Sequence, residues 1–268
     1  MNIQNVIAML GSKGIEASVD TVNKNGVDRE ALLVGGDDVK MVFYTDIFSM
    51  FSDSDIIEEI CKQLKQNKLP EIDGTLFTDW NKAKTKVLAG IRPKSSDTKI
   101  AKTPFHEFEI YAYIPVGGGG IAKVTNRMCC RYGIYVEDDL MEAAYTNTAA
   151  TLILQTLDDV LSEFGYGVKG SGMPSMVLTN KDKVLGAIGL WYDDLLYMAC
   201  SKLDTDQILI IPSSVHELII LRRDDVPIDT LNQTIREINR SIVDPKEVLG
   251  DNAYIYDKVR KELYIAEE

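Results

Sequence analysis

Apolar positions recur at helical spacing in the first ten residues and then give way to strand-like alternation. The opening pattern predicts an amphipathic helix over residues 2–10 that ends at Gly11. Apolar-rich segments at residues 15–22, 31–34 and 39–44, separated by glycine-containing turns, predict three strands. The chain therefore begins with a helix followed by a small strand cluster.

Two helices are predicted next. Asp55 and Glu58 have the spacing of a capping box ahead of an apolar stripe, which predicts a helix that ends before Pro70. A second helix is expected from Phe77 to about Ile91, with Trp80 turned inward.

The middle of the chain combines a strand pair with a helix. Alternation over Phe105–Val116 predicts a long strand, which Gly117–Gly120 separates from a second strand at Ile121–Val124. The sequence becomes helical from Glu137, and one apolar stripe runs from Ile153 to Phe164.

Glycines and a proline then interrupt the pattern between Gly165 and Pro174. This interruption is the best boundary candidate, so we expect an N-terminal region over residues 1–172 and a C-terminal region over residues 173–268.

The C-terminal region mixes short strands and helices. Strands are predicted at Met176–Thr179, Leu185–Leu190, Gln207–Ile211, Val215–Leu221, Ala253–Tyr256 and Leu263–Ile265. Helices are predicted at Tyr192–Leu203, around Leu231–Ile242 and, more briefly, at Asp244–Glu247. Strands come in adjacent pairs rather than in strict alternation with helices. The expected class is therefore α+β, with mainly antiparallel strand pairs, packed amphipathic helices and two sub-domains.

Charge and composition exclude several classes of function. The 268 residues include 29 Lys and Arg against 41 Asp and Glu, a net charge of −12, which argues against sequence-independent binding to nucleic-acid backbones. No apolar run is long enough to predict a membrane helix, and the first residues lack a secretion signal.

Metal-ligating and disulfide patterns are also missing from the sequence. The four cysteines form no C-x-x-C pair, and the two histidines lie far apart, so we expect neither a metal nor a cofactor, and we expect a reducing, cytoplasmic setting. Four adjacent acid pairs, among them Asp193-Asp194, are expected to lie at helix starts and on the surface.

Gly117–Gly120 followed by Ile121-Ala122 matches the G-x-G-x-x-A pattern of dinucleotide-binding loops, and Glu137 lies about 20 residues further on. That site requires a helix to begin at the last small residue. Because residues 121–126 have a strand pattern instead, we interpret the glycines as a hairpin turn.

A hydroxyl, an imidazole and a carboxylate occur within five positions at Ser213, Ser214, His216 and Glu217. A nucleophile–base–acid relay needs these side chains to converge. If His216 and Glu217 lie on one strand, they point to opposite faces and cannot form such a relay. We therefore expect turn chemistry here and keep a catalytic role for these residues as the alternative.

Several sequence blocks, in one order, resemble a single family. They include residues 176–181, 210–217, 243–249 and 251–257, with looser similarity at 104–108. The chain resembles a family of clostridial and other gut-bacterial proteins catalogued as domain of unknown function 5688. The resemblance implies a consistent fold, a cytoplasmic setting and an association with mobile elements, and it implies no reaction.

Three functional hypotheses follow. The first is a non-enzymatic accessory or interaction protein that binds a protein partner. The second is a hydrolase or transferase that uses Ser213 or Ser214 with His216. The third is an acidic inhibitor that occupies the nucleic-acid-binding surface of a host factor.

Overall fold

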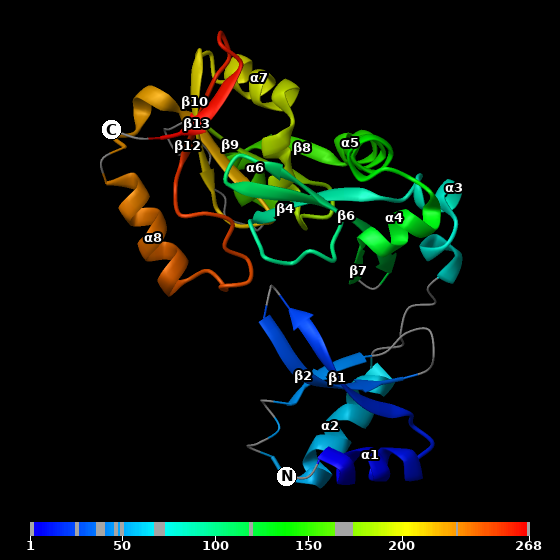
Figure 1. Cartoon of the computed structure of the whole chain (residues 1–268). Coiled ribbons are helices and arrows are strands. Elements are labelled where there is room, and N and C mark those ends of the chain that lie inside the picture. The colour runs from blue at the N-terminus through cyan, green and yellow to red at the C-terminus, as the bar shows by residue number, and fades with distance from the viewer. Residues whose placement is uncertain are drawn as a thin grey trace.

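The computed structural model describes residues 3–24, 27–35, 41–45, 48, 51–66, 73–117, 120–163, 174–228 and 230–266. Every strand pair in this part of the chain is antiparallel, and helices pack on the sheets, so the predicted α+β class is confirmed. Figure 1 shows an N-terminal body, in blue, and a larger body that contains the remaining elements.

The N-terminal body consists of two helices and a three-stranded sheet of order β1-β2-β3. Its elements are α1 (Ile3–Ser12), β1 (Ala17–Lys24), β2 (Val27–Val34), β3 (Met41–Tyr44) and α2 (Asp53–Gln66). The predicted first helix and three strands are thus confirmed, with shifted ends. Val6 and Leu10 of α1, Leu32 of β2 and Ile56 and Ile60 of α2 share one buried apolar cluster, which gives this body its own core.

The start of α2 lies two residues before the predicted capping position. The Ser52 hydroxyl accepts a hydrogen bond from the Asp55 backbone N–H at 3.3 Å, and the Asp55 carboxylate accepts one from the Ser52 N–H at 3.4 Å. The reciprocal cap therefore joins Ser52 to Asp55, and the predicted pair Asp55 and Glu58 was wrong.

The larger body is built around a six-stranded sheet of order β13-β12-β10-β11-β9-β8. Its strands are β8 (Leu152–Thr156), β9 (Ser175–Asn180), β10 (Gln207–Pro212), β11 (Leu218–Arg222), β12 (Tyr254–Asp257) and β13 (Glu262–Ile265). One face of this sheet, which includes Leu178, Ile210 and Tyr256, packs into the main core. Its other face packs against α8 (Leu231–Ser241) through a smaller cluster that includes Leu209 and Ile235.

A second sheet faces the main core beside the first. Its central strand is β6 (Phe108–Gly117), which pairs with β4 (Leu88–Pro93) on one side and, on the other, with β5 (Lys102–Phe105) followed by β7 (Gly120–Lys123). The free edge of β4 is closed by side chains, because Thr148 accepts a hydrogen bond from the Ala89 N–H at 2.8 Å.

Helices and short helical turns complete this body around the two sheets (Figure 1). They are η2 (Gly74–Phe77), α3 (Trp80–Ala83), α4 (Asn126–Tyr132), η3 (Val136–Leu140), α5 (Met141–Ala149), α6 (Leu157–Glu163), η4 (Gly186–Trp191), α7 (Asp193–Lys202) and η5 (Arg223–Asp225).

The helix predicted over Phe77–Ile91 was wrong in its second half, which forms β4. The run from Val87 to Ile91 is almost wholly apolar and buried, which fits a strand covered on both faces. The buried Tyr111 ring lies against Gly90, where an added Cβ would meet the ring at 2.7 Å, so the close approach of the ring favours glycine here.

The apolar stripe from Ile153 to Phe164 was predicted as one helix, but it contains both β8 and α6. Thr156 marks the change, because its hydroxyl accepts a hydrogen bond from the Asp159 N–H at 3.1 Å and donates one to the Asp159 carboxylate at 2.6 Å. This reciprocal cap begins α6 in the middle of the stripe.

The strand predicted over Leu185–Leu190 was also wrong, because these residues form η4. Leu185 has a φ of 60°, and an added Cβ on Gly186 would lie 2.5 Å from the Asn180 backbone nitrogen. The segment therefore turns tightly onto β9 instead of extending. Residues 244–247 likewise form hydrogen-bonded turns where a short helix was predicted.

The structure groups the chain differently from the division predicted after residue 172. That division separates β8 from β9, yet the two strands pair from Leu152 opposite Asn180 to Thr156 opposite Met176. One apolar core also extends from Ala83 to Tyr256. The glycine-rich segment itself lies largely at residues 164–173, outside the described residues.

Candidate groove between two hairpins

The four residues singled out from the sequence lie in the connection between β10 and β11. Ser213 is hydrogen-bonded to the Glu217 carboxylate at 3.5 Å, whereas the Ser214 hydroxyl accepts a bond from the backbone N–H of His216 at 3.0 Å. The connection is thus closed by its own hydrogen bonds. No hydrogen bond joins either serine hydroxyl to the His216 ring among the described contacts.

The His216 ring is held by other partners. Its Nδ1 accepts a hydrogen bond from the Leu185 N–H at 3.0 Å, and its Nε2 lies 3.5 Å from the Glu247 carboxylate. An acceptor at Nδ1 fixes the neutral tautomer with the proton on Nε2. The imidazole therefore ties η4 to the segment before Tyr254 and is not placed to take a proton from Ser213 or Ser214.

The glycine motif lies between two paired strands. β6 and β7 are antiparallel, with Gly117 opposite Gly120, and Ile121 and Ala122 belong to a strand. The strand expected after the glycines is confirmed, although Gly118 and Gly119 lie outside the described residues. No helix N-terminus is present at Ile121 to face a pyrophosphate.

We predict that NAD, FAD and ATP will not bind at this turn. A thermal-shift measurement at about 1 mM nucleotide should leave the melting temperature unchanged. A ligand with a Kd of about 10 μM would add roughly 2.7 kcal/mol of stability under those conditions, so a clear upward shift would contradict the prediction.

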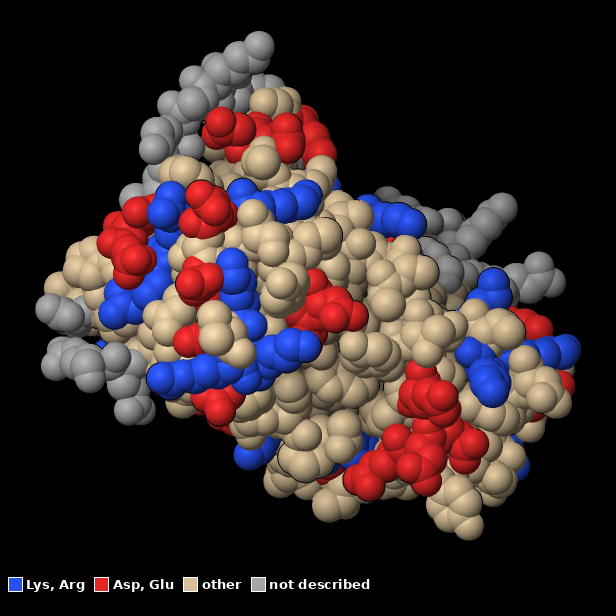
Figure 2. Space-filling view, turned by 90° about the horizontal axis from the view of Figure 1, so that it is seen from above, with Lys and Arg blue, Asp and Glu red and all other residues tan. Residues whose placement is uncertain are grey.

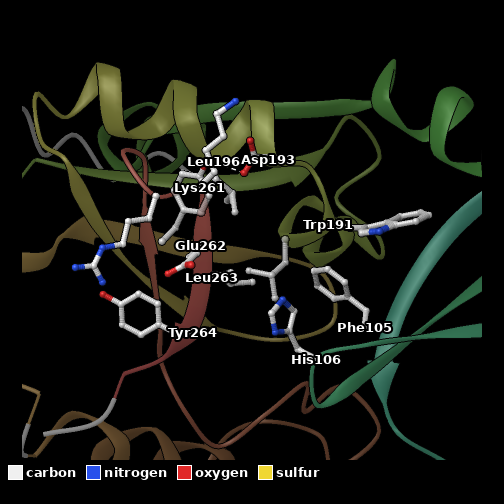
Figure 3. A pocket seen from close by; sticks show the side chains of 12 residues that line it. Phe105, His106, Trp191, Asp193, Leu196, Lys261, Glu262, Leu263 and Tyr264 are labelled. Atoms are coloured by element: carbon white, nitrogen blue, oxygen red, sulfur yellow. Dashed lines mark hydrogen bonds between the residues drawn. The ribbon is translucent and has the colours of Figure 1, made fainter.

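A different feature, an open groove, lies where the β5–β6 hairpin faces the β12–β13 hairpin and the start of α7. Its volume is about 750 Å³. It is lined by Phe105, His106, Leu190, Trp191, Asp193, Leu196, Tyr256 and residues 260–264. Figure 3 shows Phe105 and His106 on one side of the groove and Glu262, Leu263 and Tyr264 on the other.

The β5–β6 hairpin forms the first wall. His106 begins its two-residue turn with a φ of 48°, a conformation that non-glycine residues adopt rarely. Behind the turn, the Tyr254 hydroxyl donates a hydrogen bond to Glu107, and the Tyr254 and Phe108 rings pack with centroids 5.5 Å apart. The hairpin is thus fastened to β12, so Phe105 and His106 are presented on a fixed support.

The start of α7 forms the floor with η4. The Tyr256 hydroxyl, itself on a buried side chain, donates a hydrogen bond of 2.6 Å to the Asp193 carboxylate. Burial, together with this bond to a carboxylate, raises the pKa of Tyr256 well above its ordinary value, so Tyr256 stays protonated at physiological pH. The hydrogen bond between Tyr256 and Asp193 therefore orients the Asp193 carboxylate, and the protonated Tyr256 hydroxyl cannot act as a general base.

Aromatic rings continue from the groove onto the neighbouring surface. The Trp191 and Tyr145 rings pack edge to face with their centroids 4.9 Å apart. The Tyr145 ring stacks on the Tyr192 ring with a centroid separation of 4.3 Å. Because Tyr145 keeps 37% of its surface exposed, these rings form an accessible aromatic area beside the groove.

Charges of both signs surround the apolar floor. Arg260 and Lys261 lie in the exposed turn between β12 and β13, and neither is in an ion pair with a described residue. Glu262 and Asp193 supply carboxylates. Figure 2 shows acidic and basic side chains intermingled over part of the face it presents and acidic groups elsewhere on it, so this face does not have uniformly acidic character.

No local sequence pattern pointed to this groove. Its walls come from residues 105–106, 190–196 and 256–264, which are brought together only by the pairing of β12 with β10 and the docking of the β5–β6 hairpin. A weak hint was available, since Phe105 and His106 belong to one of the sequence blocks that resemble the family.

Metal-ligand clusters and membrane-length helices can be assessed in the described part of the chain. No cluster of three or more His, Cys, Asp or Glu side chains suited to a metal ion occurs there. Within the same residues, no helix combines the length and apolar character of a membrane span. All four cysteines are free.

The fold and the groove define an α+β protein with an open, aromatic-walled groove. The chain belongs to DUF5688, a family of unknown function, whose family model matches residues 2–258. No curated protein and no solved structure matches the chain.

Proposed function

We propose that the protein is a non-enzymatic interaction protein that binds a segment of a protein partner in the groove. The observation that carries this proposal is the composition of the groove, which combines an apolar floor, aromatic walls and exposed basic groups at an open rim. Protein-binding surfaces are enriched in aromatic residues and arginine and are bounded by polar rims.

The rigidity of the walls supports the same role. Glu107 and Tyr254 fasten one wall, and Tyr256 and Asp193 fasten the floor. A surface that is already ordered loses little conformational entropy when a partner binds, which favours affinity.

The four free cysteines support a reducing cytoplasm as the site of action. We further propose that the partner belongs to a bacterial host in which the protein is carried by a mobile element. Genomic neighbourhood tests this part of the proposal directly, since genes of mobile elements would flank the coding sequence.

Affinity capture with matched variants tests partner binding. The double variant Arg260→Glu/Lys261→Glu changes the exposed rim, whereas Ile121→Glu changes a residue on β7 that is 37% exposed and outside the groove. A partner captured from the native host by the wild type and by Ile121→Glu should be lost with the double variant. After purification, its Kd should rise at least tenfold for the double variant. Equal binding to all three proteins would overturn the proposal.

A further inference from the structure

β13 ends the six-stranded sheet, and no described strand pairs with its outer edge. An edge strand presents unpaired N–H and C=O groups that another chain can use. The free edge of β4, in contrast, is closed by Thr148, and Asn147 donates a hydrogen bond of 2.9 Å to the Val87 carbonyl just before β4 begins.

The pairing of β13 with β12 shows which backbone groups point outward. The Ala266 N–H donates to the Ala253 carbonyl at 2.8 Å, so Ala253 and Ala266 are opposed as a hydrogen-bonded pair. Hydrogen-bonded and non-hydrogen-bonded pairs alternate along antiparallel strands. Tyr264 therefore directs its N–H and C=O groups toward β12, and Leu263 and Ile265 direct theirs toward the free edge.

The groove follows this edge. Side chains alternate between the two faces of a strand, so a concavity on one face would be lined by every second residue. Five consecutive residues, Arg260 to Tyr264, line the groove. Two of these residues belong to the turn, whereas Glu262, Leu263 and Tyr264 are consecutive in β13 and point to both faces of the strand. The concavity therefore reaches the edge of β13 at Leu263.

We infer that the groove receives an extended segment of the partner that adds to the sheet as an antiparallel strand beside β13, with acidic residues at its C-terminal end. This inference rests on the proposed function and specifies the form and charge of the bound segment. Main-chain hydrogen bonds to Leu263 and Ile265 would supply affinity, and side chains directed onto Phe105 and Leu196 would supply specificity.

Charge complementarity fixes the acidic character and its position. Arg260 and Lys261 precede β13 in the chain, so they lie beside the C-terminal end of a strand that runs antiparallel to it. Both are exposed, and neither forms an ion pair with a described residue, although a hydrogen bond from Gln207 and, to a smaller extent, the charge of Arg260 help to lower the pKa of the nearby Asp257 carboxyl. Acidic residues at that end of the segment would therefore be attracted, and the attraction should weaken as salt is added.

The probe is a fluorescein-labelled peptide, Thr-Val-Thr-Phe-Thr-Val-Glu-Glu. Two further peptides carry N-methyl groups on alternate backbone amides, one set on the odd positions and the other on the even positions. N-methylation removes hydrogen-bond donors along one edge of the peptide only. Binding to the full-length protein is measured by fluorescence anisotropy at two salt concentrations.

Edge pairing predicts that one N-methylated peptide binds like the unmodified probe and that the other binds at least tenfold more weakly. Leu263→Pro removes an outward N–H at a position where an edge strand tolerates proline, and it should weaken binding at least tenfold. Leu263→Ala shortens the same side chain but keeps the N–H, so it should bind the probe several-fold more tightly than Leu263→Pro does. Ile265→Pro repeats the test at the second outward position. Melting temperatures identify any variant that fails to fold.

Arg260→Glu/Lys261→Glu should also weaken binding at least tenfold, whereas Lys86→Glu, at an exposed position outside the groove, should not. Absence of probe binding at millimolar concentration, or equal binding of both N-methylated peptides, would overturn the inference. A dimer of the free protein that is lost in Leu263→Pro would assign the edge to a second copy and overturn it as well. If the captured partner binds Arg260→Glu/Lys261→Glu more weakly than the wild type but binds Leu263→Pro as tightly as the wild type, the proposed partner binding is retained and the inferred edge pairing is wrong.

Discussion

Replacing Glu109 by glutamine is expected to lower the free energy of unfolding by about 3–5 kcal/mol, a large part of the roughly 5–15 kcal/mol that stabilises a typical domain. The Glu109 side chain is only 6% exposed and lies 2.6 Å from the Arg92 Nε and 2.7 Å from the Lys102 Nζ. It also accepts a hydrogen bond of 2.8 Å from the Ser95 hydroxyl. Glutamine keeps the shape of the side chain but leaves two largely buried cations without a counter-charge.

Urea unfolding followed by tryptophan fluorescence measures this loss, because both tryptophans, Trp80 and Trp191, lie in the larger body. Glu163→Gln is the matched control. Glu163 pairs with Lys183 across side chains that are 44% and 43% exposed, so its replacement should leave the urea midpoint nearly unchanged. Equal stabilities of the two variants would show that the buried network contributes little.

The same network predicts how stability depends on pH. Burial raises the pKa of Glu109, but hydrogen bonds from Lys102 and Ser95 and the charge of Arg92 outweigh it, so the pKa is lowered overall from 4.5. A lowered folded-state pKa means that the carboxylate stabilises the protein above its unfolded-state pKa. This contribution is lost as the pH falls through the folded-state value. The difference between wild type and Glu109→Gln should therefore shrink below about pH 4.

Local patterns predicted the elements whose cores are also local. The first helix and the three strands after it could be found because the apolar spacing within each segment matches the face that it buries in the N-terminal core. The errors occur where tertiary packing sets the conformation. β4 depends on the Tyr111 ring lying over Gly90, and η4 depends on the close approach of Gly186 to β9. Neither partner is adjacent in sequence, so spacing alone could not reveal them.

The candidate site shows the same limit. Ser213, Ser214, His216 and Glu217 drew attention because they are close in sequence, yet their hydrogen bonds serve the turn and its anchoring. The groove, in contrast, is assembled from three segments that are distant in sequence. Its outward backbone groups depend on the pairing of β13 with β12, and hydrogen-bond register is not visible in side-chain chemistry.

A fragment of residues 73–268 is expected to fold cooperatively, whereas a fragment of residues 173–268 is expected not to fold. The shorter fragment lacks β8, which pairs with β9, and lacks the hairpin that supplies the Glu107 partner of Tyr254. It also exposes the main-core face of the six-stranded sheet, because the second sheet is missing. Burial of apolar area is the main favourable contribution to folding, so the shorter fragment loses most of its stability.

Circular dichroism during urea titration measures both outcomes. The fragment of residues 73–268 should show one sigmoidal transition near that of the larger body in the full chain, because the N-terminal body has a separate apolar core. The fragment of residues 173–268 should show a gradual change without a transition. A cooperative transition in the shorter fragment would instead support the boundary at the glycine-rich segment. It would mean that β9 to β13, together with α7 and α8, bury enough apolar surface to remain folded without β8 or the second sheet.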